Sequence, residues 1–529
     1  MIGAGASGLY ALYHLQKRGY NAMIIEAGTG VAGTWYWNRY PGLRVDIESV
    51  EYSYAFDDEL QQDWEWSERY SAQPELESYF NHVADRFNMR PSILLNNRLT
   101  TAKYDDDKAV WRLETDQGHT FEAQFCIMAT GLLSAPKEVT FPGVEQFQGQ
   151  TVQTARWPAE DVAYAGKRVA VIGTGSSGIQ VVPVVAETAE QLYVFQRTPA
   201  YAVPLRNCVP PEGYFEEVKA NYSDWRHKEK YESFGGWISV NYEQVQLTTT
   251  SALEVSEEER LALYNDRWKS GGLALYNVYP DIFASQEANE TLAQFIREKI
   301  RERIDDPELA EKMTPDYPIL TRRLSADTGY YEAFNRDNVT LVDVRSDAIE
   351  CFTPTGLRTA SGEEYEVDIV IFATGFDAMS GALDRIRVIG RDGRSLNDHW
   401  SSEIRTTFGM MAEGFPNMFY ISGPGSPAPL YQPVLLCEDQ MDWITALLEH
   451  MSKEGKTAAD STWDLEQSWI EECDRAVEAT LFNDVPSWYV GRNIDGKSGR
   501  GLVYFGGIYP YREWIEKCAS DDYAGLELR

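Results

Sequence analysis

The sequence predicts an α/β fold with two Rossmann-like dinucleotide-binding units and a helical insertion in the second unit. Two observations carry this prediction. A short apolar strand followed by a glycine-rich turn occurs twice, with turn glycines Gly3, Gly5 and Gly8, then Gly173, Gly175 and Gly178. Such turns let the backbone approach a pyrophosphate at a helix N-terminus. The stretch 212–318, by contrast, is rich in charge and helix signals. Two turns of this kind imply two bound dinucleotides.

Composition limits the possible partners. The chain has 529 residues, of which 43% are hydrophobic and 13% aromatic, which is enough for two or three domains with sizeable cores. The formal charge of −34 argues against nucleic acid, because phosphate binding needs a basic face. Only 15 of the 48 basic residues are Lys, so a salt-adapted source is a hypothesis.

Targeting and metal signals are weak. No run of 18 apolar residues suggests a membrane span, and a glycine motif occupies the N-terminus, where a signal peptide would stand. We therefore expect a cytoplasmic protein, as a monomer or weak homo-oligomer. The six cysteines are scattered without metal-ligand spacing, so we expect no metal site.

The first unit begins at the start of the numbered chain. After the turn, Leu9, Leu12 and Leu15 follow a helical period, and Glu26 ends the next apolar strand, 18 residues after Gly8. A carboxylate there can accept ribose hydroxyls. Only two residues precede the turn, so the numbered chain is expected to begin inside the first strand.

The stretch from Gly33 to Asp46 is crowded with aromatic residues and has no helical or strand period. After a dinucleotide fingerprint, a rigid aromatic loop is best interpreted as a wall of the cofactor pocket; a packed surface loop is the alternative. Farther on we expect a helix over 77–87, a hairpin over 110–115 and 120–125, and a strand over 126–131 that meets ligand at its C-terminal edge.

The second unit differs at the position that carried Glu26. Arg197 stands 19 residues after Gly178, next to Thr198. A guanidinium there can bind a 2′-phosphate that a carboxylate would repel, so this site favours NADPH. An ordinary surface arginine is the alternative.

The remainder of the chain alternates between helices and strands. We expect a capping box at 256–259, helices over 285–304 and from Pro307, and strands from residue 338. A strand over 368–376 and one from Phe419 should meet ligand, and long helices are expected over 433–448 and 463–481. The resulting domains are the first unit at 1–135 and 369–529, a linker at 136–165, and the second unit at 166–211 and 319–368 with the insertion at 212–318.

The chain resembles the type I Baeyer-Villiger monooxygenases of the cyclohexanone monooxygenase kind over nearly its whole length. The family pattern F-x-G-x-x-x-H-x-x-x-W-P is matched by Phe147, Gly149, Trp157 and Pro158, with Gln153 in place of the histidine. A second pattern, G-x-W-x-x-x-x-[FY]-P-G-x-x-x-D, is complete from Gly33 to Asp46.

The resemblance implies specific site residues. By this match Arg323 is the active arginine, Asp46 orients it, Arg322 lies near the NADP phosphate, and Trp488 and Lys497 belong to a mobile C-terminal loop. The residues expected at the cofactors are Gly3, Gly5, Ser7, Gly8, Glu26, Gly33, Thr34, Trp35, Tyr40, Asp46, Gly173, Thr174, Gly175, Ser176, Ser177, Gly178, Arg197, Thr198, Arg322, Arg323, Thr374, Gly375 and Trp488.

The implied chemistry is the oxygenation of a ketone to an ester or lactone. FAD reduced by NADPH would react with O2 to a C4a-peroxide, which attacks the carbonyl beside a fixed cation. Loops near Ala326, Ser380–Leu383 and Pro427–Gln432 would wall the pocket. Two alternatives remain: oxygenation of amine or sulfide heteroatoms, and a redox-inactive NADP(H) sensor, which Gln153 alone favours because an amide cannot take a proton.

Overall fold

The first unit is a parallel sheet assembled around the second residue of the chain. The computed structural model describes residues 1–240, 243–244, 248–492 and 502–529. Across this sheet lie β2 (Ile93–Leu94), β1 (Ile24–Ile25), Ile2, β6 (Cys126–Met128) and β20 (Met418–Tyr420). Ile2 bridges both Ile25 and Met128, so the position of the expected first strand is taken by Ile2. Helix α1 (Ala6–Lys17) follows the turn and buries Leu9, Leu12 and Leu15 as predicted.

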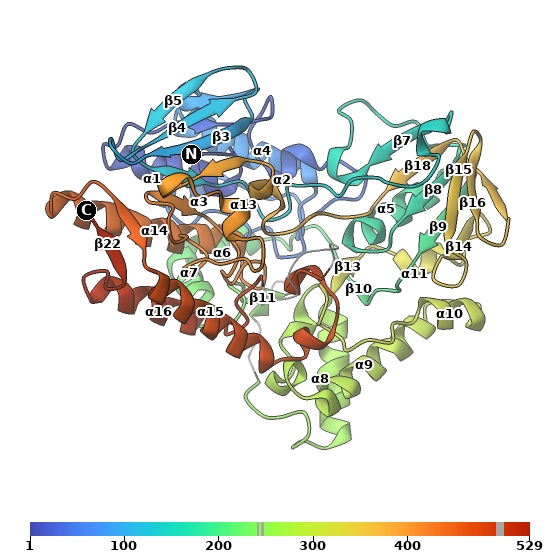
Figure 1. Cartoon of the computed structure of the whole chain (residues 1–529). Coiled ribbons are helices and arrows are strands. Elements are labelled where there is room, and N and C mark those ends of the chain that lie inside the picture. The colour runs from blue at the N-terminus through green and yellow to red at the C-terminus, as the bar shows by residue number, and fades with distance from the viewer. Residues whose placement is uncertain (241–242, 245–247, 493–501) are drawn as a thin grey trace.

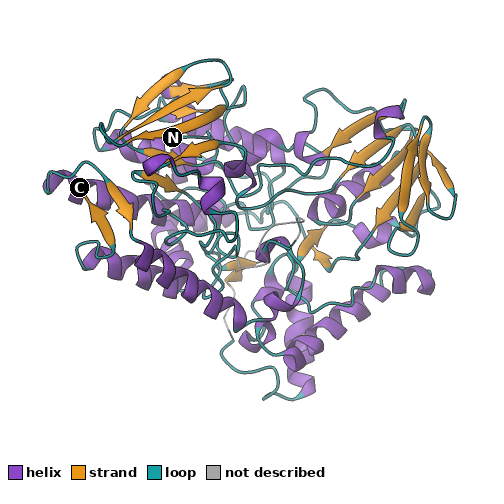
Figure 2. Cartoon of the chain, in the orientation of Figure 1, coloured by secondary structure: helices purple, strands orange, loops and turns teal. Residues whose placement is uncertain are grey.

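The second unit is a five-stranded parallel sheet on the other side of the molecule. Its order is β14 (Val339–Asp343), β9 (Gln191–Gln196), β8 (Arg168–Ile172), β18 (Ile369–Phe372) and β7 (Gln150–Gln153). Helix α5 (Ser176–Ala186) follows the second turn, as α1 follows the first. Figure 2 shows most of the strands gathered in two groups on opposite sides of the chain, with most helices below and between them.

One expected domain boundary is wrong. The crossing back to the first unit was placed after residue 368, but Ile369–Phe372 form β18, which pairs with both β8 and β7 inside the second sheet. All four of its residues are buried, as expected for a strand covered on both faces of a parallel sheet. Residues 150–153, expected in the linker, are the edge strand of the same sheet.

Each unit carries a smaller sheet. On the first unit, β3 (Leu99–Asp105), β4 (Val110–Thr115), β5 (Thr120–Ala123) and β19 (Arg387–Ile389) form four strands that include the predicted hairpin. On the second unit, β15 (Ile349–Thr353), β16 (Gly356–Thr359) and β17 (Glu364–Glu366) pack Phe352 and Leu357 against the five-stranded sheet.

The helical insertion divides between two parts of the molecule. Helices α6 (Tyr214–Ala220) and α7 (Tyr222–Tyr231) lie against the first unit, whereas α8 (Glu257–Ser270), α9 (Gln286–Arg301) and α10 (Pro307–Met313) lie along the lower edge in Figure 1. The predicted capping box is confirmed, because Ser256 and Glu259 hydrogen-bond reciprocally. Ser285 and Asp306 cap the next two helices.

The C-terminal helices complete the first unit. Helix α14 (Pro433–Lys453) extends five residues beyond its predicted end and packs along α1, where Arg18 pairs with Glu449 at 3.2 Å. Helix α15 (Trp463–Glu478) and α16 (Ile508–Ser520) follow, and β21 (Ala459–Ser461) pairs with β22 (Leu526–Leu528). The shorter elements used below are α2 (Thr34–Trp37), α4 (Gln73–Arg86), β10 (Ala202–Pro204), β13 (Ser325–Asp327) and α12 (Gly381–Asp384).

Two absences hold for these described residues. None of their helices is both long and apolar enough to cross a bilayer. Nor do their His, Cys, Asp and Glu side chains form any group of three or more that is arranged to hold a metal ion.

Candidate active site

The first glycine turn is closed by backbone contacts that leave no room for side chains. A Cβ atom on Gly3, whose φ is +103°, would lie 2.5 Å from the carbonyl oxygen of Ala129, and one on Gly8 would lie 1.9 Å from that of Gly3. Since contacts under 3.0 Å are not tolerated by Cβ atoms, both positions require glycine. The turn delivers the N-terminus of α1, with its free N–H groups, to the C-terminal edge of the sheet.

Glu26 lies beside this turn as predicted, but its carboxylate already has backbone partners. Its Oε2 accepts a hydrogen bond from the N–H of Ala4 at 2.7 Å, and its Oε1 accepts one from Gly28 at 2.6 Å. The residue is only 5% exposed. A carboxylate can accept about four hydrogen bonds, so capacity remains for a ribose hydroxyl.

The aromatic loop from Gly33 to Asp46 connects the two units. Gly33 stacks on Gly5, since a Cβ on Gly33 would lie 2.7 Å from the Cα of Gly5. At its other end the Tyr40 hydroxyl donates to Oε1 of Gln180 on α5 at 2.7 Å, and a Cβ on Gly42 would lie 2.3 Å from the Gln180 carbonyl oxygen. The loop is therefore packed between the first turn and the helix of the second turn.

The loop ends at an ion pair between the two units. The Arg323 guanidinium donates to Oδ2 of Asp46 from Nη2 at 2.5 Å and from Nε at 3.1 Å. The two side chains are 23% and 31% exposed, so the pair is partly screened from water. The match to the family pattern placed these residues together, although 277 positions separate them in the chain.

Two tyrosines that the sequence reasoning missed complete this cluster. The hydroxyl of Tyr276, in the helical insertion, accepts from the N–H of Leu324 at 3.1 Å. Tyr489 is fully buried, and its side chain interacts with that of Arg323. Burial alone would lower the pKa of Arg323, but Asp46 and the two hydroxyls outweigh burial and raise it, so the guanidinium stays charged.

The second glycine turn repeats the first. A Cβ on Gly173, whose φ is +113°, would lie 2.4 Å from the carbonyl oxygen of Ala373, and one on Gly178 would lie 2.2 Å from that of Gly173. Ser176 hydrogen-bonds to Ser325 at 2.9 Å, which ties the turn to the strand that follows Arg323. Thr174 donates to the carbonyl oxygen of Thr198 at 2.9 Å, which fixes the segment next to Arg197.

Two arginines of the second unit have no counter-ion among the residues that the structure describes. Arg197 is exposed, and the guanidinium of Arg322 lies 4.6 Å from the Tyr317 ring with its Nε buried and unbonded. Within the described part of the chain neither arginine has a hydrogen bond or an ion pair. The Thr374 hydroxyl is buried and has no hydrogen-bond partner in the described ranges. These unsatisfied groups and the glycine cradles fit a phosphorylated dinucleotide.

The linker motif lies at the edge of the second sheet. Gln153 ends β7, and its Nε2 donates to the carbonyl oxygen of Lys137 at 2.9 Å. Gly149 is confined, since a Cβ there would lie 2.4 Å from the carbonyl oxygen of Asp368. Phe147 is buried in the core beside the second sheet, and Trp157 and Pro158 are half-buried.

The remaining predicted residues lie at several places. Thr34 is the first residue of α2 and is exposed. Ser7 and Ser177 lie in the first turns of α1 and α5. Trp35 is buried, and its ring centroid lies 5.7 Å from that of Tyr52. Gly375 has open space around it. Of the loops expected to wall the pocket, β13 holds Ala326, the stretch Ser380–Leu383 overlaps the first three residues of α12, and the 427–432 loop leads into α14. The Trp488 and Tyr489 rings are tilted against each other with their centroids 4.3 Å apart, whereas Lys497 lies outside the described residues.

Comparisons with known proteins agree with this arrangement. The family model described as pyridine nucleotide-disulphide oxidoreductase matches residues 1–204. An acetone monooxygenase (methyl acetate-forming) from Gordonia sp. (strain TY-5) is 40% identical over 532 residues, covering 100% of this chain and 98% of the relative. A phenazine N-monooxygenase from Lysobacter antibioticus is 36% identical over 532 residues, covering 100% of this chain and 96% of the relative.

A solved structure extends the likeness to the cofactors. The OTEMO complex with FAD and NADP has a TM-score of 0.95 at 36% identity and covers 100% of this chain and 98% of that one. The chain thus belongs to the Baeyer-Villiger monooxygenases, flavin enzymes that use FAD, NADPH and O2 to insert one oxygen next to a ketone carbonyl and give an ester or lactone.

Proposed function

We propose that Arg323 is the catalytic cation of this monooxygenase and that Asp46 positions it. We further propose that the substrate is a small ketone. The observation that carries the proposal is the Arg323–Asp46 ion pair, which lies where the loop from the first turn meets the strand tied to the second turn. The substrate class is supported by the acetone-oxidising relative, which is similar along the whole chain.

The bound flavin supplies the oxygen that is transferred, and the protein supplies charge and orientation. Arg323 keeps its positive charge at every working pH, because its raised pKa lies above the range in which enzymes act. A fixed guanidinium can stabilise the negative charge that develops on the ketone oxygen when the carbonyl is attacked. Preorganised donors of this kind contribute about 3 to 4 kcal/mol each.

Asp46 has a different role from Arg323. Both of its hydrogen bonds from Arg323 reach the same oxygen, Oδ2, which holds the planar guanidinium in one orientation. Its negative charge also offsets the cation when the site holds no developing charge. Tyr276 limits the movement of the backbone that carries Arg323, through its hydrogen bond to Leu324.

The same proposal assigns the cofactor contacts. The two glycine turns hold the pyrophosphates of FAD and NADPH, Glu26 accepts a ribose hydroxyl of FAD, and Arg197 and Arg322 bind the 2′-phosphate of NADPH. The support is geometric: the glycines leave backbone N–H groups accessible, and neither guanidinium has a hydrogen bond or an ion pair within the described chain.

The test separates the two halves of the catalytic cycle. Arg323→Ala should still reduce its flavin with NADPH under anaerobic conditions, since the glycine turns and Arg197 are untouched. Ester formed per NADPH should fall by about 10²–10³-fold, as for the loss of one preorganised donor, and the electrons should appear as hydrogen peroxide. Asp46→Ala should fail in the same direction but less severely, because it acts through Arg323.

Arg322→Ala is the matched control, because it removes the neighbouring cation. It should weaken NADPH binding and leave ester yield per NADPH unchanged. A near-normal ester yield from Arg323→Ala would contradict the assignment and make Arg322 the next candidate.

A second candidate activity is oxygenation of an aromatic nitrogen, which the phenazine N-monooxygenase favours because it is similar over the same full length. Parallel assays with small ketones and with aromatic N-heterocycles, followed by product analysis, distinguish the two. Product from the heterocycle alone would replace the ketone proposal.

A further inference from the structure

A buried ion pair lies directly behind Asp46. Nε of Arg69 donates to Oε1 of Glu48 at 2.9 Å, and the two side chains are 0% and 1% exposed. The other carboxylate oxygen of Glu48, Oε2, accepts from the Ser239 hydroxyl at 2.7 Å. The backbone is joined at the same place, because the N–H of Ser49 donates to the carbonyl oxygen of Arg69 at 2.8 Å. The stretch that carries Asp46 is therefore fastened to Arg69 through both side chain and backbone.

The Arg69 guanidinium also reaches the base of the insertion, a name used below for residues 204–208 and 270–276. Nη1 donates to the carbonyl oxygen of Arg206 at 3.1 Å, and Nη2 donates to that of Ser270, where α8 ends, at 3.3 Å. A guanidinium is planar and donates along fixed directions. One side chain thus sets the position of its carboxylate partner relative to both stretches of the base.

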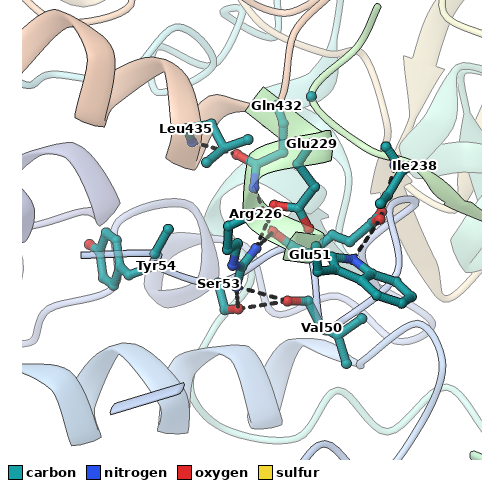
Figure 3. Close-up of polar contacts among 12 residues, drawn as sticks. Val50, Glu51, Ser53, Tyr54, Arg226, Glu229, Ile238, Gln432 and Leu435 are labelled. Atoms are coloured by element: carbon teal, nitrogen blue, oxygen red, sulfur yellow. Dashed lines mark hydrogen bonds and ion pairs between the residues drawn. The ribbon is translucent and has the colours of Figure 1, made fainter. Parts of the chain in front are cut away.

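Helix α7 of the insertion holds the stretch 46–53 farther along, as Figure 3 shows. Its Arg226 donates to the carbonyl oxygen of Val50 at 3.0 Å and to the Ser53 hydroxyl at 2.7 Å. The same guanidinium pairs with Glu229 at 2.7 Å, and both side chains are buried. The stretch is thus held at both ends by buried contacts with the insertion.

The base of the insertion contacts the other member of the catalytic pair as well. Shortly after α8 ends, the Tyr276 hydroxyl accepts from the N–H of Leu324 at 3.1 Å, and Leu324 follows Arg323 directly. The contacts therefore close a ring. It runs from Asp46 through Arg69 to the base of the insertion, from there through Tyr276 to Arg323, and back to Asp46.

The two ion pairs of this ring differ in their exposure to water. The Arg323 and Asp46 side chains are 23% and 31% exposed, so water competes for their hydrogen bonds, whereas Arg69 and Glu48 are dry. A buried ion pair adds little net stability over apolar residues of the same size, since both charges lose their hydration. Its directional hydrogen bonds do fix the geometry of the segments that they join.

We propose that Arg69 is a positioning residue for the oxygenation step. It holds the stretch that carries Asp46 against the base of the insertion, and so sets where Asp46 meets Arg323. This inference rests on the proposed role of Arg323 and adds the residue that keeps its partner in place. A displacement of ~1 Å at a reacting group can cost about 10²-fold in rate, so a small shift of Asp46 should be visible in the products.

The test uses the full-length holoenzyme and Arg69→Lys. Lysine keeps the positive charge beside Glu48, but its ammonium lacks the planar fork that also reaches Arg206 and Ser270. The variant should stay yellow and keep its anaerobic rate of flavin reduction by NADPH, because both glycine turns are untouched. Ester formed per NADPH should fall by about 10-fold, less than for a full ångström of displacement, with hydrogen peroxide replacing the missing ester mole for mole.

Arg405→Lys is the matched control. Arg405 is another buried arginine whose side chain has three partners, Glu403 and, on α15, Glu466 and Gln467. Both lysine variants should melt at lower temperature than the unmodified enzyme, but Arg405→Lys should keep its ester yield. An ester yield from Arg69→Lys as high as that from Arg405→Lys, measured where both are folded, would overturn the proposal.

A second background separates this inference from the role of Arg323. When Asp46→Ala is already present, Arg69→Lys should lower the ester yield no further, because the contact that it positions is gone. A further 10-fold loss there, again about a tenth of the ~10² scale for 1 Å, would overturn the inference and leave the Arg323 assignment intact. A full ester yield from Arg323→Ala would instead remove that assignment.

Ser239→Ala gives the answer if Arg69→Lys does not fold. It removes one hydrogen bond to Glu48 and leaves the buried charges paired. Ester per NADPH should fall by about 2- to 5-fold, within what the loss of one hydrogen bond can cause, while flavin reduction stays unchanged. An unchanged ester yield in a folded Ser239→Ala would count against the proposal in the same way.

Discussion

The two glycine turns have the same backbone packing, but they differ in the residues that surround them. In each, the first glycine lies under the carbonyl oxygen of an alanine that ends a neighbouring strand, and the third lies against the carbonyl oxygen of the first. The distances from a Cβ atom to those oxygens are 2.5 Å at Gly3, 2.4 Å at Gly173, 1.9 Å at Gly8 and 2.2 Å at Gly178.

The surroundings of the two turns are not alike. A Cβ atom on Gly5, the middle glycine of the first turn, would lie 3.4 Å from the Cα of Gly33, whereas one on Gly175 would have nothing within 4 Å. Glu26 is 5% exposed, and Arg197 at the matching position of the second unit is exposed. The first turn is thus closed by the protein and suits a cofactor that stays, while the second is open and suits one that is exchanged in each cycle.

The largest effect is expected from replacing the third glycine of either turn with alanine. Gly8→Ala should abolish FAD retention and give a colourless protein, because the backbone must shift away from Gly3. Gly178→Ala should keep the yellow colour and slow flavin reduction by NADPH by about 10²-fold or more, as expected for a displacement of ~1 Å. Bound flavin absorbance and stopped-flow reduction measure both.

Gly175→Ala is the control for this pair. Its φ is −80° and its surroundings are open, so the alanine fits the protein and only a bound dinucleotide can meet it. Unfolding or loss of flavin in Gly175→Ala would mean that the second turn is packed more tightly than the open space around Gly175 indicates.

A smaller effect should come from the exposed arginine that distinguishes the second site. Arg197→Ala should weaken NADPH by about 1.5–3 kcal/mol, as for a hydrogen bond to a charged group, and leave NADH unchanged. Arg345→Ala, which removes an exposed arginine paired with Asp316 beyond the end of β14, is the control. Equal affinity of the unmodified enzyme for NADPH and NADH would refute the assignment.

The linker between the units should tolerate its unusual residue. Gln153→His should change coupled turnover only a few-fold, because the structure uses the side chain as a hydrogen-bond donor to Lys137. Gln153→Ala should cost about 0.5–1.5 kcal/mol of stability, for one lost hydrogen bond. A gain of orders of magnitude in Gln153→His would mean that the natural protein is impaired, and would revive the sensor alternative.

The smallest effect concerns an ion pair on the second sheet, between Arg168 and Asp368. Asp368 accepts hydrogen bonds from the Arg168 side chain and N–H, which lower its pKa. A lowered pKa means that the contribution is present at neutral pH and is lost as pH falls through the folded value. Asp368→Asn should therefore reduce the free energy of unfolding by ~0.2–1 kcal/mol near pH 7 and by less near pH 2; the effect is small because the two side chains are 34% and 38% exposed. Urea titrations at both pH values test this, and an equal loss at both would contradict it.

Local signals in the sequence predicted most of the fold. Ser256 and Glu259 form the capping box that their spacing indicates. The first strand of the predicted hairpin has the expected bounds, 110–115, and the second ends at Ala123, two residues earlier than expected. The boundary near Asp368 failed because an apolar strand fits the centre of either parallel sheet, and local pattern does not say which.

The site was predictable where a motif spans it and nowhere else. Arg323 and Asp46 were matched through family patterns, although Glu26 was assigned to ribose without its backbone partners. Tyr276 and Tyr489 reach the same place from unrelated segments, and a lone tyrosine carries no spacing signal. Long-range pairing of this kind is set by tertiary packing, which periodicity does not record.

The division of the helical insertion has a consequence for recombining this enzyme with its relatives. Helix α7 places Arg226 and Glu229 among the buried partners of the first unit, whereas α8, α9 and α10 are joined to one another. A chimaera cut at residue 212 would bring a foreign α7 and separate a buried charge cluster from its counter-ions. A crossover placed just before Ser256 would keep that cluster within one parent, so exchangeable blocks in this chain follow the buried charges rather than the order of its domains.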